Sequence, residues 1–252
     1  MIYIDLDAHV RKLARFLTNL IFPPKCIFCR RIIVMPTDGI CDICETEQKL
    51  VGWINGQTRL GPGLIFVDGV FAGCEYTELV KSAVVRLKFY DVSVVAKPLA
   101  FMMARGLSNY ADLFDVIIPV PLSAERLASR GFNQSELIAT ELSRLLEINL
   151  DAASLVRVRH TKKQSLTKGA ERLENIAAAF DVRSSRCVVG PRGTAGNMDS
   201  AATTSSVNSI VGKRVLLVDD VLTTGSTAAE CARVLREAGA QKVYVAVVAV
   251  AI

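Results

Sequence analysis

Two adjacent carboxylates stand out in the stretch VLLVDDVLTTGST, which covers residues 215–227. Asp219 and Asp220 follow a run of apolar residues that is typical of a buried strand. Like charges at such a place repel each other and resist the loss of water, so we expect a polar or cationic partner beside them. The two acids could accept hydrogen bonds from sugar hydroxyls, or hold Mg²⁺ directly or through water.

The residues after the acids suit a phosphate group. They are expected to begin a helix, where unpaired N–H groups and the positive end of the helix dipole face an anion. The glycine permits close approach of the backbone, and the hydroxyls add hydrogen-bond donors. These residues are Thr223, Thr224, Gly225, Ser226 and Thr227. The stretch is therefore predicted to hold a ribose and a phosphate together. Response-regulator receiver domains also place acids after a strand, but too little chain follows Asp220 for that fold.

Four of the seven cysteines form two CxxC pairs that are separated by eleven residues. This spacing favours a tetrahedral four-cysteine zinc site, whose metal would supply much of the folding free energy of its module. A disulfide pair, a redox CxxC and an iron–sulfur cluster are the alternatives. The paired residues are Cys26, Cys29, Cys41 and Cys44, whereas Cys74, Cys187 and Cys231 stand alone as ordinary core or surface residues.

A basic cluster lies between Arg157 and Arg172, where six lysines and arginines face one acid, Glu171. The cluster suits either a solvated loop or a loop that contacts phosphates. The net charge of the whole chain, +5, is compatible with anionic ligands but does not identify one.

Strands and helices alternate from residue 66 onward, which predicts an α/β fold with a mostly parallel sheet and helices on both faces. Ligands bind such sheets at the carboxyl ends of the strands, where the two acids lie. Helices are predicted at 77–91, at about 93–110, from near Asn133 or Ser135, and at about 226–238. Strands are predicted as a short pair within 66–76 and at 115–121, 155–159, 179–183, 214–218 and 242–252.

Three segments are predicted along the chain: an amphipathic helix at 1–22, a zinc-ribbon module at 23–62, and a main domain at 63–252. The N-terminal helix could pack on its own protein, on a partner or on a membrane. Residues 184–209 are rich in Gly, Ser, Thr and Ala and are predicted to be a flexible insertion.

The composition of the 252 residues, 51% hydrophobic and 22% charged, is that of a globular protein. No apolar run reaches the roughly 18–20 residues that a membrane-spanning helix needs, so no membrane insertion is expected. The first residues lack the pattern of a secretory signal, and we expect a cytoplasmic protein.

VLLVDDVLTTGST resembles the phosphoribosyl-pyrophosphate (PRPP) motif of type I phosphoribosyltransferases. The double CxxC and three further stretches extend the resemblance to one subfamily, the ComF family of competence proteins, also described as amidophosphoribosyltransferase-like. The stretches are LKFYD (87–91), PVPLSAERLASRGFNQSELIA (119–139) and RVRHTKKQSLTKGAERLENIAAAF (157–180). The match covers 22–183 and 212–252, and the insertion is the main departure.

The resemblance implies a type I phosphoribosyltransferase-like domain that binds PRPP with Mg²⁺, behind a structural zinc module. Asp219 and Asp220 would bind the ribose hydroxyls, and Thr223 through Thr227 the 5′-phosphate. The loop with Pro121, Arg126 and Arg130 would bind pyrophosphate, and 157–172 would close over the substrate. Structural roles are the alternative for some of these residues: Arg130 and Gln134 could serve only to fix the turn into the helix, and Lys88 could be an ordinary surface residue.

Three functions follow. The first is a pentosyl-transferring glycosyltransferase that moves ribose 5-phosphate from PRPP to a nitrogen acceptor, although no base-recognition signature identifies that acceptor. The second is a non-catalytic protein of natural transformation that binds single-stranded DNA, for which aromatic residues (6%) give little stacking support. The third is a PRPP sensor without turnover. The sequence does not specify the oligomeric state.

Overall fold

The structure of the protein is a computed structural model that describes residues 22–33, 38–48, 50–54, 64–89, 92–158, 179–183 and 210–251. Three sequence predictions fall outside these residues: the N-terminal helix, nearly all of the basic segment 157–172, and the insertion 184–209.

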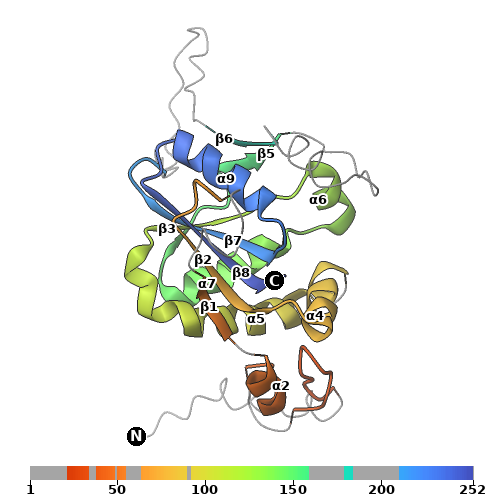
Figure 1. Ribbon diagram of the computed structural model, residues 1–252. Helices are drawn as coiled ribbons and strands as arrows, with labels where there is room; N and C mark the ends of the chain where they lie inside the picture. The colour runs from red at the N-terminus through yellow and green to blue at the C-terminus, as the bar shows by residue number, and fades with distance from the viewer. Residues whose placement is uncertain are drawn as a thin grey trace, which may run out of the picture.

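A six-stranded sheet forms the centre of the fold (Figure 1). Its outer strand β1 is antiparallel to β2, and all other neighbours are parallel, which confirms the predicted mostly parallel sheet. In spatial order the strands are β1 (Leu50–Ile54), β2 (Gly69–Glu75), β8 (Lys242–Val250), β7 (Arg214–Leu222), β3 (Val116–Pro119) and β4 (Asn149–Leu150).

The central strands are apolar on both sides because both faces of the sheet are covered. In β7, Leu216 and Val218 pack into one hydrophobic cluster, while Val215 and Leu217 pack into the other. This explains why the strand reads as a continuous apolar run rather than as an alternation of apolar and polar residues.

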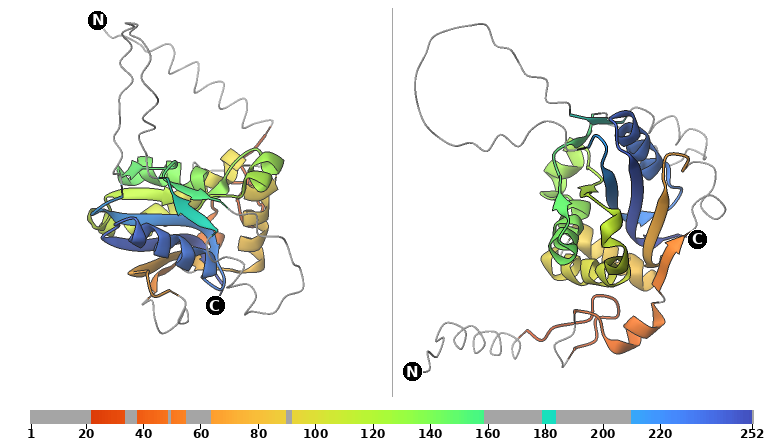
Figure 2. Two further views of the ribbon diagram at one scale, coloured as in Figure 1. Left: turned by 90° about the horizontal axis from the view of Figure 1, so that it is seen from above. Right: turned by 90° about the vertical axis from the view of Figure 1, so that its left-hand side faces the viewer.

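Helices and a small second sheet cover the two faces (Figures 1 and 2). One face carries α4 (Glu78–Phe89), α5 (Val92–Leu107) and α7 (Gln134–Leu146). The other carries α9 (Ser226–Glu237) and the antiparallel pair β5 (Leu155–Arg157) and β6 (Phe180–Val182). The prediction of helices on both faces is confirmed.

Several elements differ from the sequence prediction. The segment 66–76 holds one strand, β2, rather than a pair, because its residues stay extended along β8. The predicted helix at 93–110 ends at Leu107 and continues as a 3₁₀ helix, η1 (Ser108–Leu113). The strands predicted at 155–159 and 179–183 pair with each other instead of joining the main sheet.

Two further differences bear on the site. Strand β7 continues through Asp219 and Asp220 to Leu222, because the backbone stays paired with β8 beyond the acids. A short helix, α6 (Ala124–Arg130), occupies part of the segment that was predicted to be a loop. Ser123 caps this helix by accepting a hydrogen bond from the Arg126 N–H.

We predict that Gly106→Ala destabilises the protein by about 1–3 kcal/mol, despite a gain in helix propensity of up to about 1 kcal/mol. A Cβ at Gly106 on α5 would lie 2.5 Å from Cζ of Phe71, which is fully packed on β2. Urea denaturation measures the change, with the exposed Ser108→Ala as a control that is expected to alter stability by less than about 0.5 kcal/mol. Unchanged stability of Gly106→Ala would contradict this close packing.

Candidate functional site

The two acids lie near the carboxyl end of β7, flanked by the ends of β3 and β8. Asp220 is buried, with 6% of its surface exposed, and Asp219 is partly exposed. The N-terminal residues of α7 and the last turn of α4 bring polar side chains to both carboxylates.

Asp219 is oriented by one of its two oxygens. Its Oδ1 accepts hydrogen bonds from the Ser135 hydroxyl (2.9 Å) and from the Asp220 amide (2.8 Å). Among the described residues, none hydrogen-bonds Oδ2 of Asp219, so this oxygen can accept a hydrogen bond from a ligand.

Ser135 reaches the acids because Asn133 ties the start of α7 to the end of β3. The Asn133 side chain accepts a hydrogen bond from the Ser135 amide (3.2 Å) and donates one to the carbonyl of Val120 (3.0 Å). Asn133 is therefore the N-cap of α7. It is one of the two N-cap candidates, Asn133 and Ser135, that the sequence predicted.

Asp220 has partners on both oxygens. Its Oδ1 accepts a hydrogen bond from the Val221 amide (2.8 Å). Its Oδ2 lies 2.6 Å from Nζ of Lys88 and accepts a longer hydrogen bond, 3.4 Å, from the side-chain nitrogen Nε2 of Gln134. The cationic partner that the sequence led us to expect is thus Lys88, at the end of α4.

Burial and the neighbouring Asp220 charge raise the pKa of Asp219 from 3.8 to about 7, against the opposing effects of its hydrogen bonds and of Lys88. Asp219 therefore changes charge near neutral pH. A carboxyl with a pKa shifted into this range is typical of a functional site.

Arg130 lies near the acids, and two further arginines, Arg126 and Arg157, lie near one another. Arg130 donates a hydrogen bond to the Gln134 carbonyl oxygen, and its guanidinium lies 5.3 Å from the centre of the Phe89 ring. Burial lowers the pKa of both Arg130 and Arg157, and the positive charge of Arg126 lowers each of them further, so Arg126 is close enough to repel both. Such a cluster suits a multiply charged anion. Arg126 and Arg130 lie on α6, whereas Pro121 follows β3 directly.

The predicted phosphate segment surrounds the start of α9, which begins at Ser226. Gly225 is the N-cap residue with a φ of 76°, a conformation that favours glycine, and among the described residues no side chain caps the helix. Thr223 and Thr224 are exposed, Thr227 lies in the first turn, and the hydroxyls of Thr224 and Ser226 are 2.9 Å apart. The first amides of α9 are therefore not satisfied by a capping side chain.

The four paired cysteines converge on one point. Their sulfur atoms all lie within 4.8 Å of one another, and those of Cys29 and Cys41 are 3.7 Å apart. Four metal–sulfur bonds of about 2.3 Å in a tetrahedron place sulfurs about 3.8 Å apart, whereas a disulfide bond is about 2.05 Å long. The cluster could therefore hold a metal ion, and its geometry excludes the disulfide alternative. Cys74 and Cys231 are buried elsewhere.

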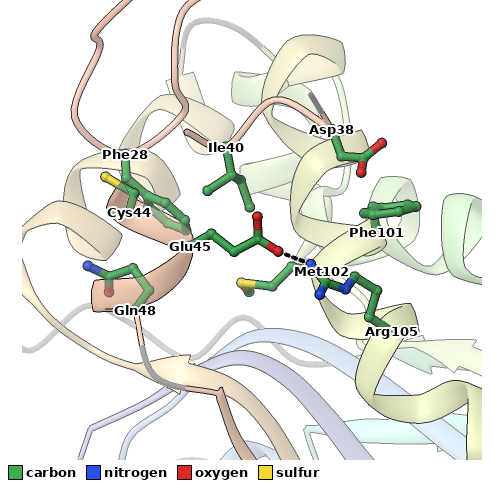
Figure 3. Close-up of a pocket in the computed structure, with 9 residues that line it drawn as sticks. All are labelled: Phe28, Asp38, Ile40, Cys44, Glu45, Gln48, Phe101, Met102 and Arg105. Carbon is green, nitrogen blue, oxygen red and sulfur yellow. Dashed lines mark hydrogen bonds and ion pairs between the residues drawn. The ribbon is translucent and has the colours of Figure 1, made fainter. Parts of the chain in front are cut away.

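The cysteine module packs against α5 around a pocket of about 360 Å³ (Figure 3). Phe28 and Ile40 of the module face Phe101 and Met102 of α5 across it. An ion pair between Glu45, on α2 (Asp42–Glu47), and Arg105, on α5, joins the two sides.

The chain belongs to the phosphoribosyl transferase domain family, whose pattern its residues 108–251 match. It is 27% identical to competence protein F of Haemophilus influenzae, over 88% of this chain and 94% of that protein. It is 30% identical to the DNA utilization protein YhgH of Salmonella typhi (90% and 96%) and 28% identical to competence protein ComFC of Bacillus subtilis (85% and 78%). These relatives confirm the resemblance to the ComF family.

None of the helices in the described part of the chain has the length and hydropathy to cross a bilayer.

Proposed function

We propose that the protein binds PRPP with Mg²⁺ at the carboxyl edge of its sheet. The observation that carries this proposal is the pairing of an oriented acid, Asp219 with its available Oδ2, with a following helix start that no side chain caps. An acid that can accept from ribose hydroxyls and a helix start that can bind a phosphate match the two halves of a ribose phosphate. Membership in the phosphoribosyl transferase domain family supports the same ligand.

Each part of PRPP has a candidate partner. Asp219 and Asp220 would accept hydrogen bonds from the ribose hydroxyls, and the segment Thr223 to Thr227 would bind the 5′-phosphate. Arg126 and Arg130 would bind the diphosphate near Pro121, since a guanidinium can hold phosphate oxygens with two hydrogen bonds. The available Asp219 oxygen also fits the water shell of Mg²⁺, an ion that would neutralise charge on the diphosphate.

Transfer to a nitrogen acceptor is the second half of the proposal. A bond from the nitrogen to the anomeric carbon forms as the bond from that carbon to the pyrophosphate oxygen breaks; the pyrophosphate leaves with the bonding electrons, and the nitrogen releases its proton to solvent. Arg130 and Arg126 would stabilise the charge of the leaving group, and the two acids would stabilise positive charge on the ribose ring. The acceptor has no assigned partner among these residues, and a PRPP sensor needs the same contacts without this step.

Calorimetry with PRPP and Mg²⁺ tests the site. We expect the wild type to bind PRPP. The double variant Asp219→Asn/Asp220→Asn should bind it at least about 100-fold more weakly, because hydrogen bonds from the ligand to two charged carboxylates are lost. Asp112→Asn is the matched control, since Asp112 is an exposed acid on η1, before β3 begins. Failure of the wild type to bind PRPP would remove both the enzyme and the sensor.

Binding of single-stranded DNA is a second candidate, in a cytoplasmic protein of natural transformation. It is favoured by the cluster of Arg126, Arg130 and Arg157, and by relatives named for competence and DNA utilization. The affinity for an oligonucleotide should then fall steeply with rising salt concentration. An affinity that is weak and independent of salt would end this candidate.

We further propose zinc as the metal of the four-cysteine cluster. Thiolate sulfur in a four-coordinate tetrahedral set is the usual environment of structural zinc, and the observed sulfur spacing fits its bond length. Zinc would hold the two cysteine turns together and would not take part in the sugar chemistry.

A further inference from the structure

The last turn of α4 contacts both halves of the candidate site. Lys88 lies 2.6 Å from Asp220, on the side proposed for the sugar, and the ring of the next residue, Phe89, lies under Arg130, on the side proposed for the diphosphate. This helix precedes residues 108–251, the part that matches the phosphoribosyl transferase domain family. The contacts therefore raise the question of what an upstream helix adds to the site.

A ligand that donates a hydrogen bond to Oδ2 of Asp220 competes with two groups already there, Nζ of Lys88 and the side-chain nitrogen of Gln134, while Oδ1 accepts from the Val221 amide. The Val221 amide is part of β7 and is fixed by the strand. Lys88 is the partner best able to move, since its ammonium is carried on a flexible four-carbon stem whose side chain is 27% exposed.

A displaced Lys88 needs a new anionic partner. Its side chain is about three-quarters buried, and a buried charge without a partner is strongly unfavourable. A diphosphate bound beside Arg130 would supply anionic oxygens near Lys88, because Arg130 hydrogen-bonds the side chain of Gln134, which contacts the same Asp220 oxygen as Lys88 does. A ligand without a diphosphate would supply none.

We propose that Lys88 exchanges partners and thereby selects ligands that carry a diphosphate. It neutralises Asp220 before binding, then moves to the diphosphate while a ribose hydroxyl takes its place on Asp220. This inference rests on the proposed function, since it concerns how the same site distinguishes PRPP from ribose 5-phosphate. PRPP offers Lys88 a new anionic partner when the Lys88–Asp220 ion pair breaks, whereas ribose 5-phosphate does not.

Calorimetry of Lys88→Met with PRPP and with ribose 5-phosphate tests the exchange. We expect PRPP to bind about 10-fold or more weakly than to the wild type, because a charged hydrogen-bond donor is lost. Ribose 5-phosphate should bind equally well or better, because its hydroxyl no longer competes with Lys88. Lys88→Arg, which keeps the charge, should retain the wild-type ratio of the two affinities within about threefold.

Three results would overturn the inference. Tighter binding of both ligands by Lys88→Met would mean that Lys88 only blocks Asp220. Equal weakening of both would mean that it only orients Asp220. A wild type that binds neither ligand would sink the proposed function together with this inference, whereas the first two results sink the inference alone.

Loss of Lys88 leaves a buried carboxylate unpaired, so Lys88→Met could fail to fold. The variant Lys88→Met/Asp220→Asn removes both charges and provides a second test, with circular dichroism as the check on folding. It should lose the preference for PRPP over ribose 5-phosphate as Lys88→Met does. A wild-type preference in this folded double variant would overturn the proposal.

Discussion

Replacing Cys44 with serine is expected to unfold the N-terminal module and to release its metal. Cys44 is fully buried, its sulfur belongs to the four-cysteine cluster, and a serine hydroxyl cannot replace a thiolate at a zinc ion. The apparent binding free energy of structural zinc sites is about 10–16 kcal/mol, more than the stability of most small domains. We therefore expect the module to unfold when one metal ligand is lost.

Elemental analysis and thermal unfolding measure this effect. We expect one zinc per chain in the wild type, a much lower content in Cys44→Ser, and a similar loss when a chelator is added to the wild type. Cys74→Ser is the matched control, because Cys74 is equally buried but donates to the carbonyl of Val248 and lies outside the cluster. A wild type that is folded and free of metal would contradict the zinc assignment.

Asp219→Asn is expected to stabilise the protein at pH 8 by about 1–3 kcal/mol while it weakens PRPP binding by at least about 10-fold. The asparagine oxygen can still accept from Ser135 and from the Asp220 amide, but the repulsion between the two acids is removed. A residue whose charge opposes folding and yet persists is explained most simply by a requirement for that charge in ligand binding.

The sign of the pH dependence follows from the raised pKa of Asp219. Between its unfolded value, near 3.8, and about 7, the folded protein binds more protons at this group than the unfolded chain does. The contribution of Asp219 to stability therefore falls as pH rises through this window and is constant above it. The stability advantage of Asp219→Asn should grow from pH 5 to about pH 7 and then level off.

Thermal and urea unfolding of the two proteins from pH 5 to pH 8 provide the test. Asp112→Asn, a change of an exposed acid outside the site, should follow the wild type at every pH. The explanation is wrong if Asp219→Asn is less stable than the wild type at pH 8, or if the difference does not vary with pH.

The sequence was most informative where the chemistry is local. VLLVDD predicts a buried strand with two acids near its end, and TTGST predicts the helix start that follows, because each pattern lies within one stretch of chain. The paired cysteines likewise predict their own cluster. These features depend on neighbours in sequence, which is why they could be found without a structure.

The partners of the acids could not be found in this way. Lys88 is one of many basic residues, and only the packing of α4 on one face of the sheet brings it to Asp220. Ser135 could be recognised as a possible helix cap, but its hydroxyl serves Asp219 instead. Helix α6 was missed because its seven residues, AERLASR, form only about two turns and carry no apolar stripe long enough to show a helical period.

The strand β1 begins at Leu50, soon after α2 ends at Glu47, so the chain leaves the cysteine cluster and enters the main sheet almost at once. The ion pair between Glu45 and Arg105 is a second connection, between the cysteine module and helix α5 on the main sheet. Together, the two connections leave the module little freedom to rotate. The cysteine module is thus held in one position relative to the sheet. The orientation of the module relative to the carboxyl edge of the sheet is therefore fixed, and inserting glycines at the 48–49 junction is expected to loosen it.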